Sequence, residues 1–227
     1  MSRFTILLNG PLQVTERLLG QVKGSRVIAA DGGIRHAEPL DLEVELWMGD
    51  FDSTENHFLG HYASVPRKTF PRAKDMTDGE LAISESLERG AENLILAGAL
   101  GGRSDHALCL VIAALDLAER GISVLASSGM EEALPLLPGR HKFDLPPGSG
   151  LSVIALSALT GLTLQGLQWP LDNHDVKPGS SLTLSNQVTG SLRVILKEGR
   201  GVIFGYPPTR PPTHKTNRKL IIPSRGG

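Results

Sequence analysis

Four short segments in the first half of the sequence are rich in aspartate and glycine, residue types that are common at metal and phosphate sites. The segments are "DGG" (31–33), "GDFDS" (49–53), "AKDMTDGE" (73–80) and "ALGGRSDH" (99–106). Two carboxylates about 4 Å apart repel each other by roughly 4 kcal/mol where the effective dielectric is near 20. A site that brings several of them together therefore needs a positive partner.

Magnesium is the partner that these residue types favour. Carboxylate oxygens without cysteine or histidine at metal-ligand spacing are typical of Mg²⁺ sites, and this ion completes its shell with water and substrate phosphates. Glycines let backbone N–H groups approach phosphate oxygens, and an arginine binds phosphate bidentately. The residues of this kind are Gly32, Gly33, Gly101, Gly102 and Arg103. The inventory is that of a phosphoryl-transfer site.

Each segment also has a simpler interpretation. An isolated Asp-Gly pair is typical of a turn, and Asp78 suits a helix N-terminus, where a carboxylate is stabilised by roughly 0.3 to 1 kcal/mol. His106 alone suits packing or hydrogen bonding. His57 and His61 suit a helix surface, because no third ligand or "HExxH" motif accompanies them. The motifs of P-loop NTPases, Rossmann dehydrogenases, protein kinases and α/β hydrolases are absent.

Short apolar runs alternate with helical patterns up to about residue 128, which predicts an α/β domain with a mostly parallel sheet over residues 1–130. Helix 78–90 should begin with a capping box formed by Thr77 and Glu80. In such sheets ligands bind beyond the carboxyl ends of the strands, where the four segments are expected. The predicted strands are 4–9, 26–30, 45–49, 93–98 and 123–128, and the other predicted helices are 14–22 and 104–121.

The predicted helix 104–121 is apolar on nearly every side until its last turns. We therefore expect it to be buried, either centrally or against a second subunit. Cys109, which belongs to it, is expected to be a core residue.

Prolines and glycines end the helical pattern at residues 131–150, which we expect to be a linker or domain edge. The short β-type runs that follow predict an all-β sandwich domain over residues 151–206. Within it, "KEGRG" (197–201) is expected to turn a hairpin. Residues 207–227 are rich in proline and basic residues and are expected to form an extended tail.

The charge balance limits the partners. The chain has 23 basic and 24 acidic residues, so no bulk attraction to nucleic acid or to an anionic membrane is expected. Its opening apolar run is too short for a signal peptide or a membrane span, and its single cysteine cannot form an internal disulfide. We therefore expect a cytoplasmic protein without a nucleic-acid or membrane partner.

In their order and approximate spacing, these segments resemble the N-terminal motifs of the thiamine pyrophosphokinase family. Two further stretches, "GLQW" (166–169) and "LSN" (184–186), resemble motifs of that family's sandwich domain. The resemblance implies a homodimer with active sites between its subunits. It also implies an ATP-dependent enzyme that transfers the diphosphate of ATP to the hydroxyl of thiamine, giving thiamine diphosphate and AMP.

The resemblance further implies roles for individual residues. Mg²⁺ would be held by Asp50, Asp52 and Asp75, with Asp78 close by. Asp105 would face the thiamine hydroxyl, as an orienting group first and a base second. Ser185 and Asn186 would approach thiamine from the sandwich. The implied nucleotide cleft contains Asp31, Gly32, Gly33, Lys74, Gly101, Gly102, Arg103 and His106, and the implied catalytic group is Asp50, Asp52, Asp75, Asp78, Arg103 and Asp105.

Two other functions stay open. The phosphate-binding residues do not identify the acceptor, so a pyrophosphokinase acting on another alcohol, such as a hydroxymethyl pterin, is one alternative. A non-catalytic thiamine or nucleotide sensor is the other, although binding alone does not need so many carboxylates. The family's thiamine pocket tends to use an aromatic surface. Trp169 and Phe204 are the candidates here, with core packing favoured for both.

Overall fold

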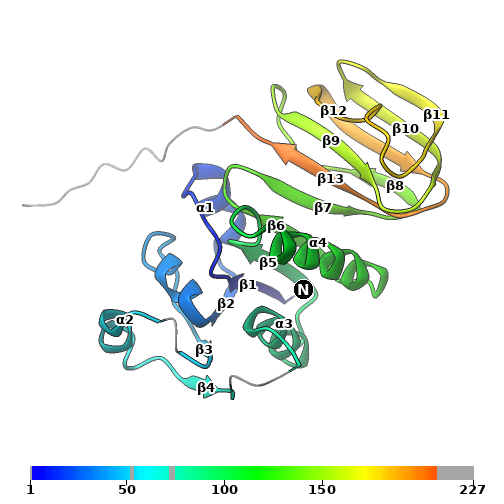
Figure 1. The fold of residues 1–227 in the computed structure, drawn as a ribbon. Coiled ribbons are helices and arrows are strands. Elements are labelled where there is room, and N and C mark those ends of the chain that lie inside the picture. Colours follow the sequence, from blue (N-terminus) through cyan, green and yellow to red (C-terminus); the bar gives the residue numbers. More distant parts are fainter. Residues whose placement is uncertain (1, 52–53, 72–74, 209–227) are drawn as a thin grey trace, which may run out of the picture.

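The structure is a computed structural model that describes residues 2–51, 54–71 and 75–208. It consists of an N-terminal α/β part with parallel strands and a C-terminal antiparallel β region, as predicted (Figure 1). One continuous path of hydrogen-bonded strands runs through both parts. Among the residues that the structure describes, no helix has the length and apolar character needed to cross a membrane.

The N-terminal part is built on a parallel sheet whose strand order is β6-β5-β1-β2-β3-β4. Apart from the polar, exposed edge strand β4, its strands are mostly apolar and buried, because both faces of the sheet are covered there. The register is continuous across the centre, where Ile6 pairs with Leu96 on one side and Ile28 on the other. The strands are β1 (Arg3–Leu7), β2 (Arg26–Ala30), β3 (Leu46–Gly49), β4 (Arg67–Thr69), β5 (Asn93–Ala97) and β6 (Ser123–Ser127).

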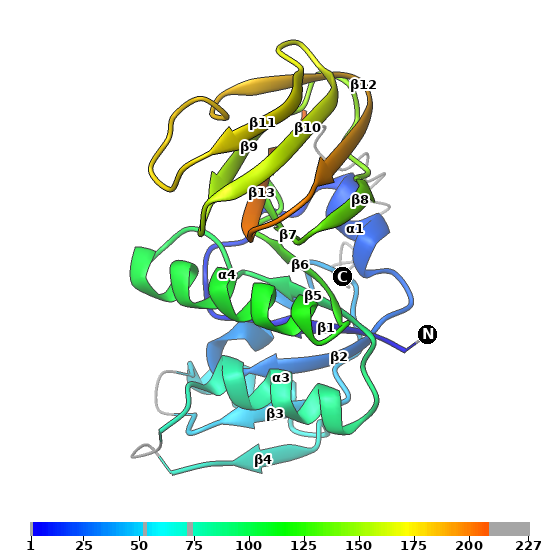
Figure 2. The same ribbon diagram turned by 90° about the vertical axis from the view of Figure 1, so that its right-hand side faces the viewer.

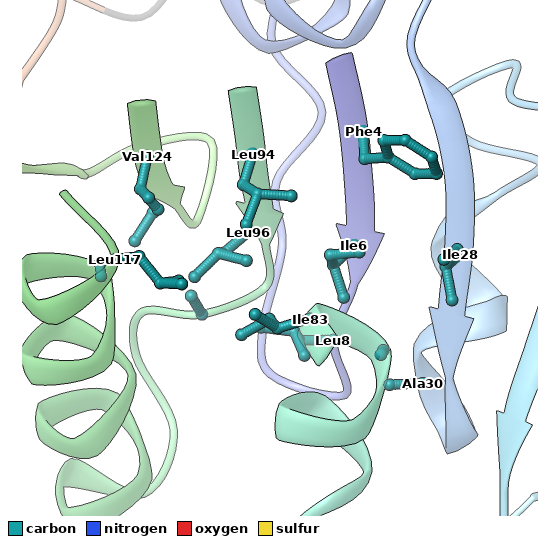
Figure 3. Close-up of a cluster of buried hydrophobic side chains, with 14 of the residues drawn as sticks. Phe4, Ile6, Leu8, Ile28, Ala30, Ile83, Leu94, Leu96, Leu117 and Val124 are labelled. Atoms are coloured by element: carbon teal, nitrogen blue, oxygen red, sulfur yellow. The ribbon is translucent and has the colours of Figure 1, made fainter. Parts of the chain in front are cut away.

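Helices cover the two faces of this sheet. Ile83 of α3 and Leu117 of α4 pack with strand side chains such as Ile6 and Leu96 on one face (Figure 3). Leu18 of α1 packs on the other face. The predicted capping box at the start of α3 is confirmed. The helices are α1 (Glu16–Val22), the 3₁₀ helix η1 (Asp31–His36), α2 (Asn56–His61), α3 (Asp78–Glu88) and α4 (Ser104–Glu119).

Of the two alternatives predicted for helix α4, central burial is wrong, and burial against a second subunit stays a prediction. The inner face of the helix is buried, but Leu108 is 56% exposed and Ile112 is 39% exposed. Cys109 is also exposed, so its prediction as a core residue was wrong. The helix lies on one face of the sheet, where only one side of it meets the core (Figure 2). Its outer apolar face is therefore free within this chain.

The C-terminal region is antiparallel. Buried side chains alternate along its strands, as in β12, and β9 and β13 contribute to the same apolar cluster as β10 and β12. The strands are β7 (Glu132–Leu136), β8 (Gly139–Lys142), β9 (Gly150–Ala155), β10 (Leu159–Leu167), β11 (Leu171–Val176), β12 (Asn186–Leu196) and β13 (Gly201–Tyr206).

Two details of this region differ from the sequence predictions. Residues 131–150, expected as a linker or domain edge, contain strands β7 and β8, and β7 continues the sheet by pairing with β6. The hairpin predicted at "KEGRG" is wrong, because β9 lies between β12 and β13 and pairs with both. Long-range pairing with β9 replaces the local pairing that the turn residues suggested. The domain boundaries stay predictions, and the tail beyond Pro208 lies outside the described residues.

A buried ion pair joins the two parts of the chain. Arg17 of α1 donates from Nε to Oε1 of Glu132 in β7 at 2.5 Å and from Nη2 to Oε2 at 3.0 Å. Gln21 donates to the same Oε1 at 2.7 Å. The Glu132 side chain is only 3% exposed, so its charge depends on these donors for stabilisation.

We expect Glu132→Ala to lower the free energy of unfolding by about 3 kcal/mol, because it leaves the Arg17 charge largely buried without its main partner. Urea unfolding followed by circular dichroism measures the change. Asp116→Ala is the matched control: Asp116 pairs with Arg200 at 3.4 Å on the surface. It should cost less than about 1 kcal/mol. Equal costs for the two variants would contradict a stabilising role for the buried pair.

Candidate active site

The register of the parallel sheet brings three of the four predicted segments to one edge. At that edge Leu7 of β1 pairs with Ala29 of β2 and Ala97 of β5. β2 then leads into the "DGG" segment, β3 into the "GDFDS" segment and β5 into the "ALGGRSDH" segment. The "AKDMTDGE" segment follows β4, the edge strand beside β3 (Figure 2). The placement of these segments beyond the carboxyl ends of strands is that of ligand sites in α/β sheets.

Asp31 is the most enclosed of the predicted site residues. It is 9% exposed, and its Oδ1 accepts a hydrogen bond from the Thr54 hydroxyl at 2.9 Å. Its backbone carbonyl accepts from Nε1 of the fully buried Trp47 at 2.8 Å. A Cβ at Gly49 would lie 3.1 Å from the Cβ of Asp31. Asp31 is thus fixed between the ends of β2 and β3, beside the start of the "GDFDS" segment.

The loop after β1, residues 9–11, is a part of this edge that the sequence analysis missed. Arg35 donates to the backbone carbonyls of Asn9 at 2.6 Å and Gly10 at 3.1 Å, and also to the Asn9 side chain. His36 Nε2 lies 3.0 Å from the Gly10 carbonyl. Burial lowers the pKa of His36, so the neutral ring donates this bond. The loop follows a strand as the other segments do, but it contains no acid to draw attention to it.

Close contacts at glycines hold these loops together. A Cβ at Gly33 would lie 2.1 Å from the Leu7 carbonyl oxygen, so no larger residue fits beside β1. Gly102 has a φ of +67°, and a Cβ there would lie 3.1 Å from Pro11 Cδ. The loop at residues 9–11 therefore lies between the two glycine segments. Gly32 and Gly101 occupy the neighbouring positions, against Asn9 and Pro11.

Arg103 and Asp105 lie at the start of α4 and bind each other. Arg103 donates from Nη2 to Oδ2 of Asp105 at 2.7 Å and from Nε to Oδ1 at 3.2 Å. Both side chains are exposed, as is His106, whose backbone N–H donates to Asp105 at 3.0 Å. The hydrogen bond from Arg103 lowers the pKa of Asp105 to about 2. Asp105 is therefore a carboxylate at neutral pH, and a weak base.

The predicted metal ligands are only partly visible. Asp50 is partly exposed directly after β3, Asp75 is exposed, and Asp78 is the first residue of α3. Asp52 and Lys74 lie outside the described residues. Within the ranges that the structure describes, no three His, Cys, Asp or Glu side chains form a group able to hold a metal ion. The donor type still fits Mg²⁺, which needs only one or two carboxylates when substrate phosphates complete its shell. The metal group stays a prediction.

The predicted thiamine residues lie on the sandwich strands, away from the ends of β2, β3 and β4. β10, β11 and β12 form one end of the strand path, and β2, β3 and β4 the other, a separation visible in both orientations (Figures 1 and 2). Ser185 is exposed at the start of β12, with a φ of +58°. Asn186 is 7% exposed and hydrogen-bonded to the backbone of Trp169.

The two aromatic candidates differ. Trp169 is 55% exposed, so the expectation of core packing was wrong for it. Phe204 is partly buried and packs against the α/β core, as expected.

His57 and His61 lie on the exposed surface of α2, in agreement with the simpler interpretation of that pair.

Comparisons with known proteins agree with this architecture. Residues 21–126 match the model of "Thiamin pyrophosphokinase, catalytic domain", and residues 140–203 match that of "Thiamin pyrophosphokinase, vitamin B1 binding domain". The thiamine pyrophosphokinase of Bacillus subtilis is 27% identical over 204 residues, which cover 84% of this chain and 92% of that protein.

Two crystal structures share the fold. That of the thiamine pyrophosphokinase from Bacillus subtilis superposes with a TM-score of 0.78 at 22% identity, covering 91% of this chain and 99% of its own. That of the thiamin pyrophosphokinase from Geobacillus thermodenitrificans has a TM-score of 0.77 at 24% identity, covering 91% and 98%. From the two family models that match its two parts, the chain belongs to the thiamin pyrophosphokinase family, with both its catalytic domain and its vitamin B1-binding domain.

Proposed function

We propose that the chain transfers the diphosphate of ATP to the hydroxyl of thiamine, giving thiamine diphosphate and AMP. The observation that carries this proposal is the presence of both family domains in one chain, the catalytic match on the α/β part and the vitamin B1-binding match on the β region. The glycine loops and acidic residues at the carboxyl edge of the sheet supply suitable groups for the phosphates. A single cysteine fits a cytoplasmic enzyme.

The nucleotide phosphates would lie against the glycine loops at this edge. Backbone N–H groups at residues 32–33 and 101–102 would bind phosphate oxygens, since glycines allow a close approach to the backbone. Arg103 is exposed and paired only through a surface ion pair, so it can exchange Asp105 for phosphate at little cost. Lys74, His106 and Asp31 would complete this cleft.

Asp50, Asp52 and Asp75 would hold Mg²⁺, with Asp78 close by at the start of α3. When bound, the ion neutralises charge on the transferred diphosphate and on the departing AMP. The carboxylates fix its position relative to the glycine loops, and so align the phosphorus with the attacking hydroxyl.

Asp105 would orient the thiamine hydroxyl. Once Arg103 turns to phosphate, the carboxylate is free to accept a hydrogen bond from that hydroxyl. Its low pKa makes it a weak base in the paired state. A loose phosphoryl transition state asks little of a base, so orientation is the larger contribution.

Thiamine would bind at the sandwich motifs. Ser185 is exposed beside Asn186, and Trp169 offers an exposed aromatic face for the rings of the ligand. Because these residues lie at the other end of the strand path from the loops after β2 and β3, the acceptor and the phosphates would meet between two copies of the chain.

The outer face of α4 is the surface that we assign to this homodimer. Leu108 and Ile112 are exposed one turn apart, and Leu156 of the β region is 36% exposed. Leu108 and Leu156 both line a hollow of about 260 Å³. Burying this apolar surface against a second copy would account for a helix that is apolar on nearly every side.

The reaction itself is tested by incubating the protein with ATP, Mg²⁺ and thiamine and measuring AMP and thiamine diphosphate by chromatography. We expect both products in equal amounts and none without thiamine. AMP formed only with a hydroxymethyl pterin would favour the alternative acceptor. Thiamine binding without AMP would favour a sensor, and either result would contradict the proposal.

Replacing the proposed metal ligands should depress turnover with little change in stability. We expect Asp50→Asn, Asp52→Asn and Asp75→Asn each to lower kcat by roughly 100-fold or more, because a displaced ion no longer aligns the reacting groups. Glu88→Gln is the control, an exposed acid near the opposite end of α3. A variant that keeps the wild-type rate removes that aspartate from the metal group.

Leu108→Asp should convert the dimer to a monomer, since a carboxylate in an apolar interface loses its hydration without a partner. Light scattering after size-exclusion chromatography measures the mass, and the AMP assay should show activity falling with it. Leu108→Met keeps the volume and polarity and should behave like the wild type. A wild-type protein that is active as a monomer would rule out the shared site.

A further inference from the structure

The two sandwich motifs meet through one side chain. Asn186 of "LSN" accepts at Oδ1 from the backbone N–H of Trp169 at 3.1 Å, and its Nδ2 donates to the backbone carbonyl of Trp169 at 2.7 Å. Both hydrogen bonds go to the same residue of "GLQW". The Asn186 amide thus holds the main chain of Trp169 from both sides.

Asn186 is itself firmly held. It is the first residue of β12 and 7% exposed, and its Oδ1 also accepts from the backbone N–H of Gln187 at 2.9 Å. Next to it, the Gln168 N–H donates to the Gln187 carbonyl at 2.8 Å. Two acceptor positions of Oδ1 and one donor of Nδ2 are therefore used within the protein.

Trp169 has the opposite character. It lies between β10 and β11, and 55% of it is exposed, the largest aromatic side chain left open to solvent in the described part of the chain. An indole exposed to this extent is fixed less by packing than a core residue is. The hydrogen bonds at its main chain hold the backbone from which the ring projects.

We infer that Asn186 is a positioning residue for Trp169 and does not itself recognise thiamine. This inference rests on the proposed function, in which Trp169 provides the aromatic face for the ligand rings. A short amide is suited to this because it offers an acceptor to the N–H and a donor to the carbonyl of the same residue. Asp can keep the acceptor role but not the donor role, and Ala keeps neither.

A double-mutant cycle tests this role. We expect Asn186→Ala to raise the KM for thiamine roughly five- to tenfold, the range for losing a net hydrogen-bond contribution, with the KM for ATP unchanged. In a Trp169→Ala background, Asn186→Ala should have almost no further effect, because the residue acts only through the indole. Gln187→Ala, an exposed change at the next position, is the control and should leave both constants unchanged.

Additive effects of the two substitutions would mean that Asn186 contacts thiamine directly and would overturn the inference. So would an equal rise in the KM for ATP. If Asn186→Ala does not fold, Asn186→Asp carries the same cycle, since it keeps both bonds accepted at Oδ1. If the wild-type protein forms no AMP, the proposed function fails, and the cycle is read from thiamine affinity by calorimetry. Absence of thiamine binding would then overturn the inference as well.

Discussion

The hydrogen-bond register of the parallel sheet is the constraint on which the site depends. Because β1, β2, β3 and β5 pair in parallel and are covered on both faces, their carboxyl ends must open on the same edge. The loop after β2 begins with Asp31, the loop after β3 begins with Asp50, and the loop after β5 leads to Asp105. Glycines at close contacts allow those loops to pack tightly. Acidic residues and glycines thereby follow the strands at one edge, a combination that suits the metal-bound polyphosphate of the proposed reaction.

The same sheet separates the two halves of the proposed reaction. Strands β7, β13 and β9 continue the path from the phosphate edge to the sandwich, and the Arg17–Glu132 pair joins the two parts on the α1 side. The exposed Trp169 lies on the sandwich side of this path, between β10 and β11. In the proposed homodimer, a second copy would bridge this separation and would also cover the outer face of α4. The apolar helix and the split site then have a common explanation.

Local sequence signals predicted the N-terminal part well and the C-terminal part less well, for a physical reason. The capping box at Thr77 depends only on residues close in the sequence. The apolar runs of β2 and β5 reflect burial of both faces of the sheet. Both signals can be read from the sequence. The place of β9 between β12 and β13 depends on pairing between distant segments, so the turn residues at "KEGRG" misled. Cys109 and Trp169 misled similarly, because an apolar residue that the fold leaves exposed looks like a core residue in the sequence. The loop at residues 9–11 has no acidic residue and was overlooked.

The central claim is that the acidic edge binds a divalent cation well only when a polyphosphate arrives with it. Titration of Mn²⁺ with and without α,β-methylene-ATP, followed by electron paramagnetic resonance, measures this directly. In this analogue the link between the α- and β-phosphates, which the reaction would break, cannot be cleaved. We expect weak Mn²⁺ binding by the protein alone and binding at least about tenfold tighter with the analogue, after correction for Mn²⁺ bound by the free analogue. Equal affinity under both conditions, or an Asp75→Asn protein that binds the ion as the wild type does, would contradict it.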